Sequence, residues 1–207
     1  RACFIDTFQG PVAANFATEE FGAKTAAVLY DIQSDYPRGL AKFFKNAFEE
    51  LHGKGSVVAF EAFTTGEEDF SSQLTTIIDS NADVLFVPQY YQEVPLIVKQ
   101  AHNLGWNKPI MGSDSWGSGD LTELCGDDCK GLFFSTHYTA TGATGATKEF
   151  IDIYKVKYGY VPDDVAALTW DATRLMLTAI QNTGGLSGDL AKNRDAIKGQ
   201  LAKIKDF

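Results

Sequence analysis

The sequence of 207 residues has no apolar run near the roughly 18 consecutive residues that a membrane-spanning helix needs. Basic residues are also few, because 18 Lys and Arg stand against 27 Asp and Glu, which gives a net charge of -9. Binding to nucleic acid depends largely on Lys and Arg side chains that neutralise phosphates. We therefore expect neither a nucleic-acid partner nor direct insertion into a membrane.

Complete motifs of enzymes and metal sites are missing as well. The stretch GATGATKE lacks the Gly-Lys-Ser/Thr ending of a phosphate-binding loop, and GSGDLT lacks the third glycine of a dinucleotide-binding fingerprint. No Gly-x-Ser-x-Gly nucleophile turn is present, and the three histidines lie far apart. No second pair of Cys or His completes a zinc site with Cys125 and Cys129. We therefore expect a protein without a catalytic centre, a cofactor or a metal.

The sequence contains only three cysteines. Cys125 and Cys129 enclose Gly-Asp-Asp, and they can form a short-loop disulfide if the turn brings their Cα atoms within about 7 Å. Such a bond is typical of an oxidising compartment, which favours an exported protein. Cys3 lies in an apolar stretch, so we expect it to be a buried thiol.

Short apolar runs alternate with amphipathic segments over the first two thirds of the chain. Runs such as TAAVLY and DVLFV are typical of strands in a parallel sheet that helices cover on both faces. We predict strands at 2–5, 25–30, 57–63, 84–87, 109–111 and 131–135. We predict helices at 11–20, 37–51, 70–79, 94–104 and 121–124. This order predicts a doubly wound α/β lobe of about five parallel strands.

The last third of the sequence has a different pattern. After a predicted linker, ATGATGATK, helices are predicted at 148–158, 164–183 and 191–205 with no strand between them. Their apolar stripes have no sheet to cover. The chain also begins inside a predicted strand and without a methionine. We therefore expect a piece of a larger protein, in which residues 1–138 form one lobe and residues 139–207 form a linker and helices of a second, mostly absent lobe.

In open parallel sheets, ligands bind beyond the carboxyl ends of the strands. Tyr36, Tyr90 and Trp116 each follow a predicted strand, which indicates the wall of a cleft for a small organic ligand. Tyr36 also fits a structural role at a helix start, next to Pro37. The Asp114 side chain either caps the following helix or binds a ligand. Other capping residues lie nearer the following helix, and this favours contact with a ligand.

Five segments in order resemble the periplasmic solute-binding proteins of branched-chain amino-acid ABC importers, which have type I binding-protein architecture. The segments are RACFIDTFQGPVAANFA, TAAVLYDIQSDYPRGLAKFF, FTTGEEDFSSQLTTI, PIMGSDSW and VPDDVAALTWDATRLMLTAI. Together they cover nearly the whole chain, and their order is specific to the family but not to one ligand.

This resemblance implies a clamp of two lobes that closes on a free amino acid, aliphatic or similar. The clamp would deliver this solute to a membrane ABC permease from the periplasm or the cell surface. By position, Asp114 would pair with the α-ammonium group of the ligand, and Tyr36 and Tyr90 would flank the ligand. Trp116 would close the pocket or contact the side chain of the ligand. Because Tyr90 and Tyr91 are adjacent, either of them fits the aromatic position of the family.

Two other functions stay open at this point. One is the ligand-sensing domain of a receptor or regulator with the same fold, which a fused membrane helix or signalling domain would indicate. The other is an α/β enzyme that uses Asp114 as an acid or base. That function requires a nucleophile or a cofactor loop nearby.

Overall fold

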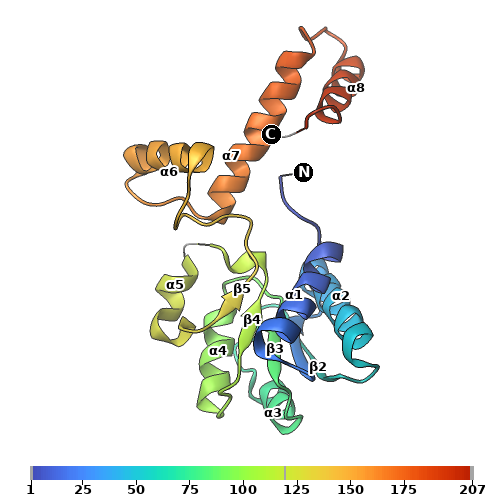
Figure 1. The fold of residues 1–207 in the computed structure, drawn as a ribbon, viewed down its shortest axis with the longest axis vertical. Coiled ribbons are helices and arrows are strands. Elements are labelled where there is room, and N and C mark those ends of the chain that lie inside the picture. Colours follow the sequence, from blue (N-terminus) through green and yellow to red (C-terminus); the bar gives the residue numbers. More distant parts are fainter. Residues whose placement is uncertain (1, 119, 206–207) are drawn as a thin grey trace. The chain divides into compact units, whose positions relative to one another are not determined.

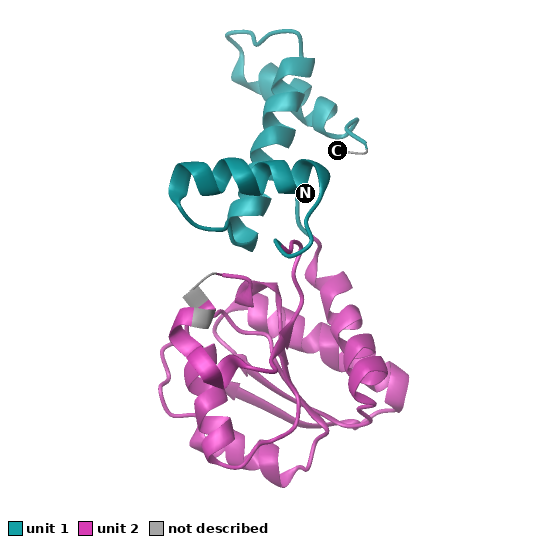
Figure 2. Ribbon diagram, turned by 60° about the vertical axis from the view of Figure 1, so that its left-hand side comes forward, with its two compact units in different colours: residues 1–3, 140–207 teal, residues 4–139 magenta. Residues whose placement is uncertain are grey.

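The computed structural model describes residues 2–118 and 120–205. The chain divides into two compact units, which Figure 2 shows in different colours. Residues 4–139 form one unit, and residues 1–3 together with 140–207 form the other.

The unit of residues 4–139 is built on a parallel sheet, which has five strands in the described part of the chain (Figure 1). The strand order is β2-β1-β3-β4-β5, and each neighbouring pair is parallel. The strands are β1 Ala26–Asp31, β2 Val57–Phe63, β3 Val84–Val87, β4 Ile110–Gly112 and β5 Phe133–Phe134. The predicted α/β lobe with a parallel sheet is confirmed.

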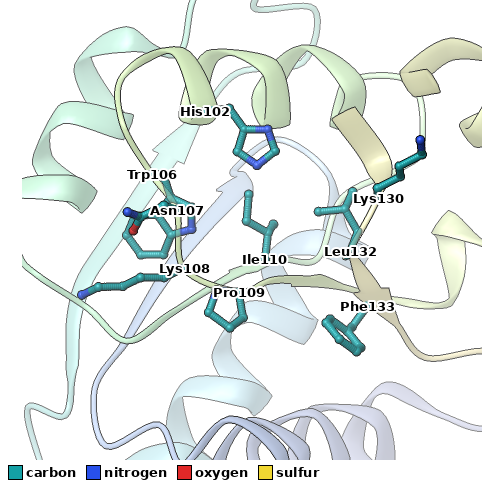
Figure 3. A pocket seen from close by; sticks show the side chains of 10 residues that line it. His102, Trp106, Asn107, Lys108, Pro109, Ile110, Lys130, Leu132 and Phe133 are labelled. Atoms are coloured by element: carbon teal, nitrogen blue, oxygen red, sulfur yellow. The ribbon is translucent and has the colours of Figure 1, made fainter. Parts of the chain in front are cut away.

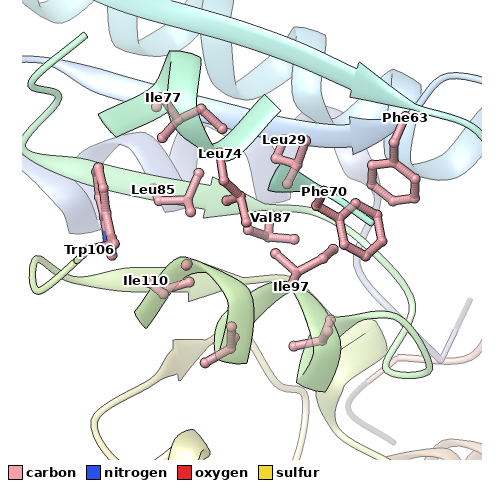
Figure 4. Packing of buried hydrophobic residues seen from close by; sticks show 14 of the residues in the cluster. Leu29, Phe63, Phe70, Leu74, Ile77, Leu85, Val87, Ile97, Trp106 and Ile110 are labelled. Carbon is pink, nitrogen blue, oxygen red and sulfur yellow. The ribbon is translucent and has the colours of Figure 1, made fainter. Parts of the chain in front are cut away.

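Helices cover both faces of this sheet. Alternate strand residues such as Val28 and Phe86 form one apolar cluster with α1 and α2. Their neighbours, such as Leu29 and Leu85, pack in a second cluster with α3, α4 and α5 (Figure 4). The helices are α1 Asp6–Phe21, α2 Asp35–His52, α3 Ser71–Asp79, α4 Val94–Asn103 and α5 Asp120–Cys125. Since each strand alternates its side chains, continuous apolar runs supply both clusters at once.

The predicted strand at residues 2–5 is wrong. These residues form no strand, and α1 begins at Asp6, five residues before its predicted start at Pro11. Within this run, the ring of Phe4 stacks on His137 with 3.7 Å between the ring centroids. Cys3 is exposed, so the prediction of a buried thiol is wrong too.

The other unit contains the helices α6 Gly145–Tyr158, α7 Asp164–Asn182 and α8 Leu190–Leu201, close to the predicted positions. Many of its large apolar side chains are exposed, including Val156, Val165 and Leu190 at 61 to 89%. The helices therefore leave apolar faces uncovered by the described residues. In the described part of the chain, no helix combines the length and the apolar character needed to cross a membrane.

At Gly10, α1 lies very close to α2. A Cβ atom at this position would lie 2.5 Å from Cβ of Phe43 on α2, which is far inside van der Waals contact. We expect Gly10→Ala to lower the free energy of unfolding by about 1–3 kcal/mol, because overpacking forces the helices apart. Urea unfolding of the two proteins measures this difference.

Gly39 on α2 is the matched control, because a Cβ atom there meets no atom within 4 Å. Gly39→Ala should raise stability by roughly 0.5–1 kcal/mol, since alanine loses less backbone entropy in a helix. Equal effects of the two substitutions would contradict the close approach at Gly10.

Candidate functional site

Asp114 lies just beyond the end of β4 and begins a short 3-10 helix, Asp114–Trp116. Its side chain is 25% exposed. The carboxylate oxygen Oδ1 accepts hydrogen bonds from the Tyr36 hydroxyl and from Nε2 of Gln9, the latter at 2.8 Å. The other oxygen, Oδ2, lies 3.8 Å from Nε2 of His137. The two donors to Oδ1 are neutral groups, so these hydrogen bonds hold the carboxylate without cancelling its negative charge.

Two of the predicted aromatic residues lie beside this carboxylate. Tyr36 is in the first turn of α2, and Tyr90 is in the loop that follows β3. Their ring centroids are 5.4 Å apart. Tyr90 is 43% exposed, whereas Tyr91 packs against the apolar cluster on the side of α3 and α4. The structure thus brings Asp114, Tyr36 and Tyr90 together at the carboxyl edge of the sheet.

The hydroxyl of Tyr36 is a stable donor to Asp114. Burial raises the pKa of Tyr36 above its ordinary value of 10, and the nearby negative charge of Asp114 raises this pKa further. An ionised Tyr36 would place two anions side by side in a partly desolvated site. The hydroxyl therefore keeps its proton at neutral pH and continues to donate.

Trp116 is buried, whereas Asp114, Tyr36 and Tyr90 are at least partly exposed. It is only 1% exposed and belongs to the apolar cluster beneath the site. Its indole Nε1 donates to the backbone oxygen of Gln89 at 3.0 Å, and Ser115 Oγ donates to the same oxygen at 2.8 Å. The expectation that Trp116 closes the pocket therefore does not fit its position. Its side chain instead ties the loop of Tyr90 to the segment of Asp114.

The two cysteines of the Cys-x3-Cys segment form a disulfide, with their Cα atoms 5.4 Å apart. Cys125 ends α5 and is 7% exposed, and Cys129 ends a short 3-10 helix, Gly126–Cys129. Both pack against the apolar cluster that contains Trp116. The disulfide thus links the end of α5 to the end of the following 3-10 helix.

A separate cavity of about 490 Å³ lies at the opposite edge of the sheet, where β4 and β5 begin. Trp106 and Leu132 are among its lining residues, and Figure 3 shows the amino groups of Lys108 and Lys130 directed away from its centre. Nζ of Lys108 donates instead to the backbone oxygen of Ala82 at 2.7 Å. Within residues 2–118 and 120–205, no group of three or more His, Cys, Asp or Glu side chains is arranged to hold a metal ion.

Comparison with known proteins shows the family of this chain. Residues 5–207 match the family described as periplasmic binding protein. The chain belongs to the periplasmic binding protein family. A curated relative of this binding protein is the leucine-, isoleucine-, valine-, threonine- and alanine-binding protein of Pseudomonas aeruginosa, 31% identical over 76% of this chain and 41% of the relative. The Leu/Ile/Val-binding protein of Escherichia coli is 28% identical over 93% of this chain and 50% of its own length.

Solved structures give the same family and fold. The leucine-binding protein LivK of Thermotoga maritima matches all of this chain with a TM-score of 0.90 and 37% identity, over 57% of its own chain. The isoleucine complex of LivJ from Streptococcus pneumoniae matches 99% of this chain with a TM-score of 0.83 and 34% identity, over 56% of its own chain. The lobe therefore has the type I fold of periplasmic binding proteins. The chain spans about half the length of the curated relatives it matches.

Three residues of the site in this binding protein were not identified from the sequence. Gln9 lies on α1, and Ser135 and His137 follow β5. Gln9 reaches Asp114 across 105 positions of sequence and Ser135 across 126. The signal available in the sequence was the place of Ser135 at the end of the predicted strand 131–135 and of His137 just after it, since such positions meet at one edge of the sheet.

The Tyr36 hydroxyl makes stability depend on pH in alkaline solution. Above pH 10 the unfolded chain loses this proton, while the folded protein retains it because the folded pKa is raised. The free energy of unfolding contributed by Tyr36 is therefore complete below pH 10 and falls as the pH rises further, by up to about 1.4 kcal/mol per pH unit. Urea unfolding between pH 9 and 11 should give a shallower decline for Tyr36→Phe than for the wild type. Parallel declines would be inconsistent with the raised pKa.

The indole hydrogen bond of Trp116 can be isolated by comparison with Trp106. Both side chains are buried, but Nε1 of Trp106 has no hydrogen-bond partner among the described residues. Trp116→Phe should cost about 1 kcal/mol more than Trp106→Phe, since only the former loses a hydrogen bond as well as ring volume. Equal losses of unfolding free energy in the two variants would show that the bond to Gln89 adds no net stability.

Proposed function

We propose that the full-length protein is the solute-binding component of an ABC importer and binds a free aliphatic amino acid in a cleft between two lobes. The observation that carries this proposal is the Asp114 carboxylate. It lies at the carboxyl edge of the sheet, is partly exposed, and is held by neutral donors beside two tyrosine rings. Such a group suits the α-ammonium of an amino acid, with which it forms a charge-assisted hydrogen bond.

In this proposal Tyr36 and Tyr90 supply the apolar wall around the ligand. A tyrosine ring covers apolar surface, and its hydroxyl can donate or accept one hydrogen bond. The names of the relatives favour leucine, isoleucine and valine as ligands, because the curated relatives are named as binding proteins for these amino acids. The solved LivJ structure holds isoleucine. The protein then acts by binding and has no catalytic step.

We assign residues 1–138 to the second lobe of the clamp, and residues 139–207 to a linker and the helical return of the first lobe. The exposed apolar faces of α6, α7 and α8 support this assignment, because helices with such faces need a sheet or other helices to cover them. The half-length match to the relatives supports it as well. A membrane permease is the partner, and the periplasm or cell surface is the compartment.

The test is to measure the binding of leucine, isoleucine and valine to the full-length protein by thermal shift and by calorimetry. A ligand at 100 times its dissociation constant should add about 2.7 kcal/mol to the unfolding free energy. Asp114→Asn should weaken the affinity roughly 10- to 150-fold, because it removes a hydrogen bond between charged groups worth about 1.5–3 kcal/mol.

Asp35→Asn is the matched control, because Asp35 is an exposed carboxylate on the same edge that pairs with Arg38. Its affinity should stay within two-fold of the wild type. Failure of all three amino acids to bind would reject the proposed ligand class. Unchanged affinity in Asp114→Asn would reject Asp114 as the ammonium contact.

A further inference from the structure

Gln9 is a buried amide that touches the candidate site from outside the strand-end loops. Its side chain is on α1, and the residue is 2% exposed. Nε2 donates to Oδ1 of Asp114 at 2.8 Å and to Oγ of Ser135 at 2.7 Å. One amide therefore joins α1, the 3-10 helix after β4 and the segment after β5.

The chemistry of the partners fixes which way this amide faces. An ionised carboxylate only accepts hydrogen bonds, so the NH₂ group of Gln9 must be the end that faces Asp114. The other end, Oε1, is then buried without a hydrogen-bond partner among the described residues. A buried polar atom without a partner is unfavourable, and a methionine of similar size would avoid it. The glutamine at this position therefore calls for an explanation beyond stability.

The two oxygens of Asp114 have different surroundings. Oδ1 accepts from both Gln9 and Tyr36, which uses the acceptor positions of that oxygen. Oδ2 lies 3.8 Å from the nearest ring nitrogen of His137, which is beyond hydrogen-bond distance. The two donors on Oδ1 restrict rotation of the carboxylate, so Oδ2 is the oxygen that is left for a further donor.

We propose that Gln9 is a positioning residue, which orients Asp114 so that Oδ2 receives the ammonium group of the ligand. This inference rests on the proposed function. The neutrality of Gln9 is part of the role, because a cationic side chain at this place would satisfy the carboxylate and compete with the ligand. Gln9 thus favours ligands with an ammonium group, although it does not contact them.

The test uses Gln9→Met in the full-length protein, with leucine and isoleucine as probes. This variant keeps the side-chain volume but removes both N–H donors. Calorimetry should show an affinity about ten-fold weaker than that of the wild type. Gln73→Met is the matched control, because Gln73 also donates from a helix to a carboxylate, that of Glu67 at 2.6 Å, away from Asp114. Its affinity should stay within two-fold of the wild type.

A second comparison separates positioning from a general loss of structure. The second comparison introduces Gln9→Met into a protein that already carries Asp114→Asn, and binding is measured at millimolar ligand. Gln9→Met should then change the affinity less than two-fold, because the carboxylate that Gln9 positions is gone. Equal losses in both backgrounds, or unchanged affinity of Gln9→Met in the wild-type background, would overturn the inference. If the Asp114→Asn proteins show no binding, the comparison with Gln73→Met decides. Absence of binding by the wild type would instead reject the proposed function.

Discussion

Strands β1 and β3 are buried at every residue, so the chain that follows either of them reaches water only after the strand has ended. The strands are parallel, and their carboxyl ends therefore lie at one edge. This constraint gathers polar groups from distant segments into a small region. The loop of Tyr90, the start of α2 and the 3-10 helix of Asp114 meet there because the core leaves no other place for them.

The apolar core also sets the depth of the site. Gly112 ends β4, and a Cβ atom on this residue would lie 2.1 Å from the ring of Trp116. The missing side chain lets the indole ring occupy the space beneath the Asp114 segment. From there its N–H holds the backbone of Gln89, next to Tyr90. Packing in the interior and the placement of the cleft residues are thus parts of one arrangement.

Burial of a carboxylate is unfavourable unless hydrogen bonds replace its lost water. Asp114 meets this requirement in part with Tyr36 and Gln9, whose donors carry no charge. A pairing with lysine or arginine would stabilise the carboxylate more strongly, but it would also cancel the charge that an ammonium group requires. The site therefore keeps a carboxylate partly desolvated, as the proposed contact with an ammonium group requires.

The sequence predicted the strands of the sheet from their apolar runs, and β2 and β3 have the predicted bounds. It misplaced the short run at residues 2–5, because four apolar residues fit a strand as well as a lead into a helix. Trp116 was expected to contact the ligand or close its pocket. The sequence pattern of an aromatic residue after a strand is the same whether the side chain is exposed or buried. Gln9 was missed because its partners lie more than 100 positions away, and no periodic pattern marks such a contact.

Gln9 and Gly10 are neighbours on one turn of α1 and have opposite surroundings. Gly10 sets how closely α1 lies against Phe43 of α2, and Gln9 donates a hydrogen bond to Asp114. A helix turn is rigid, so a change in the spacing of α1 and α2 displaces the amide by a comparable distance. Residues on the packed side of α1 are thereby coupled to the position of the amide that contacts Asp114. Under the proposed function, affinity could accordingly evolve through the contact between two helices while Asp114, Tyr36 and Tyr90 stay the same.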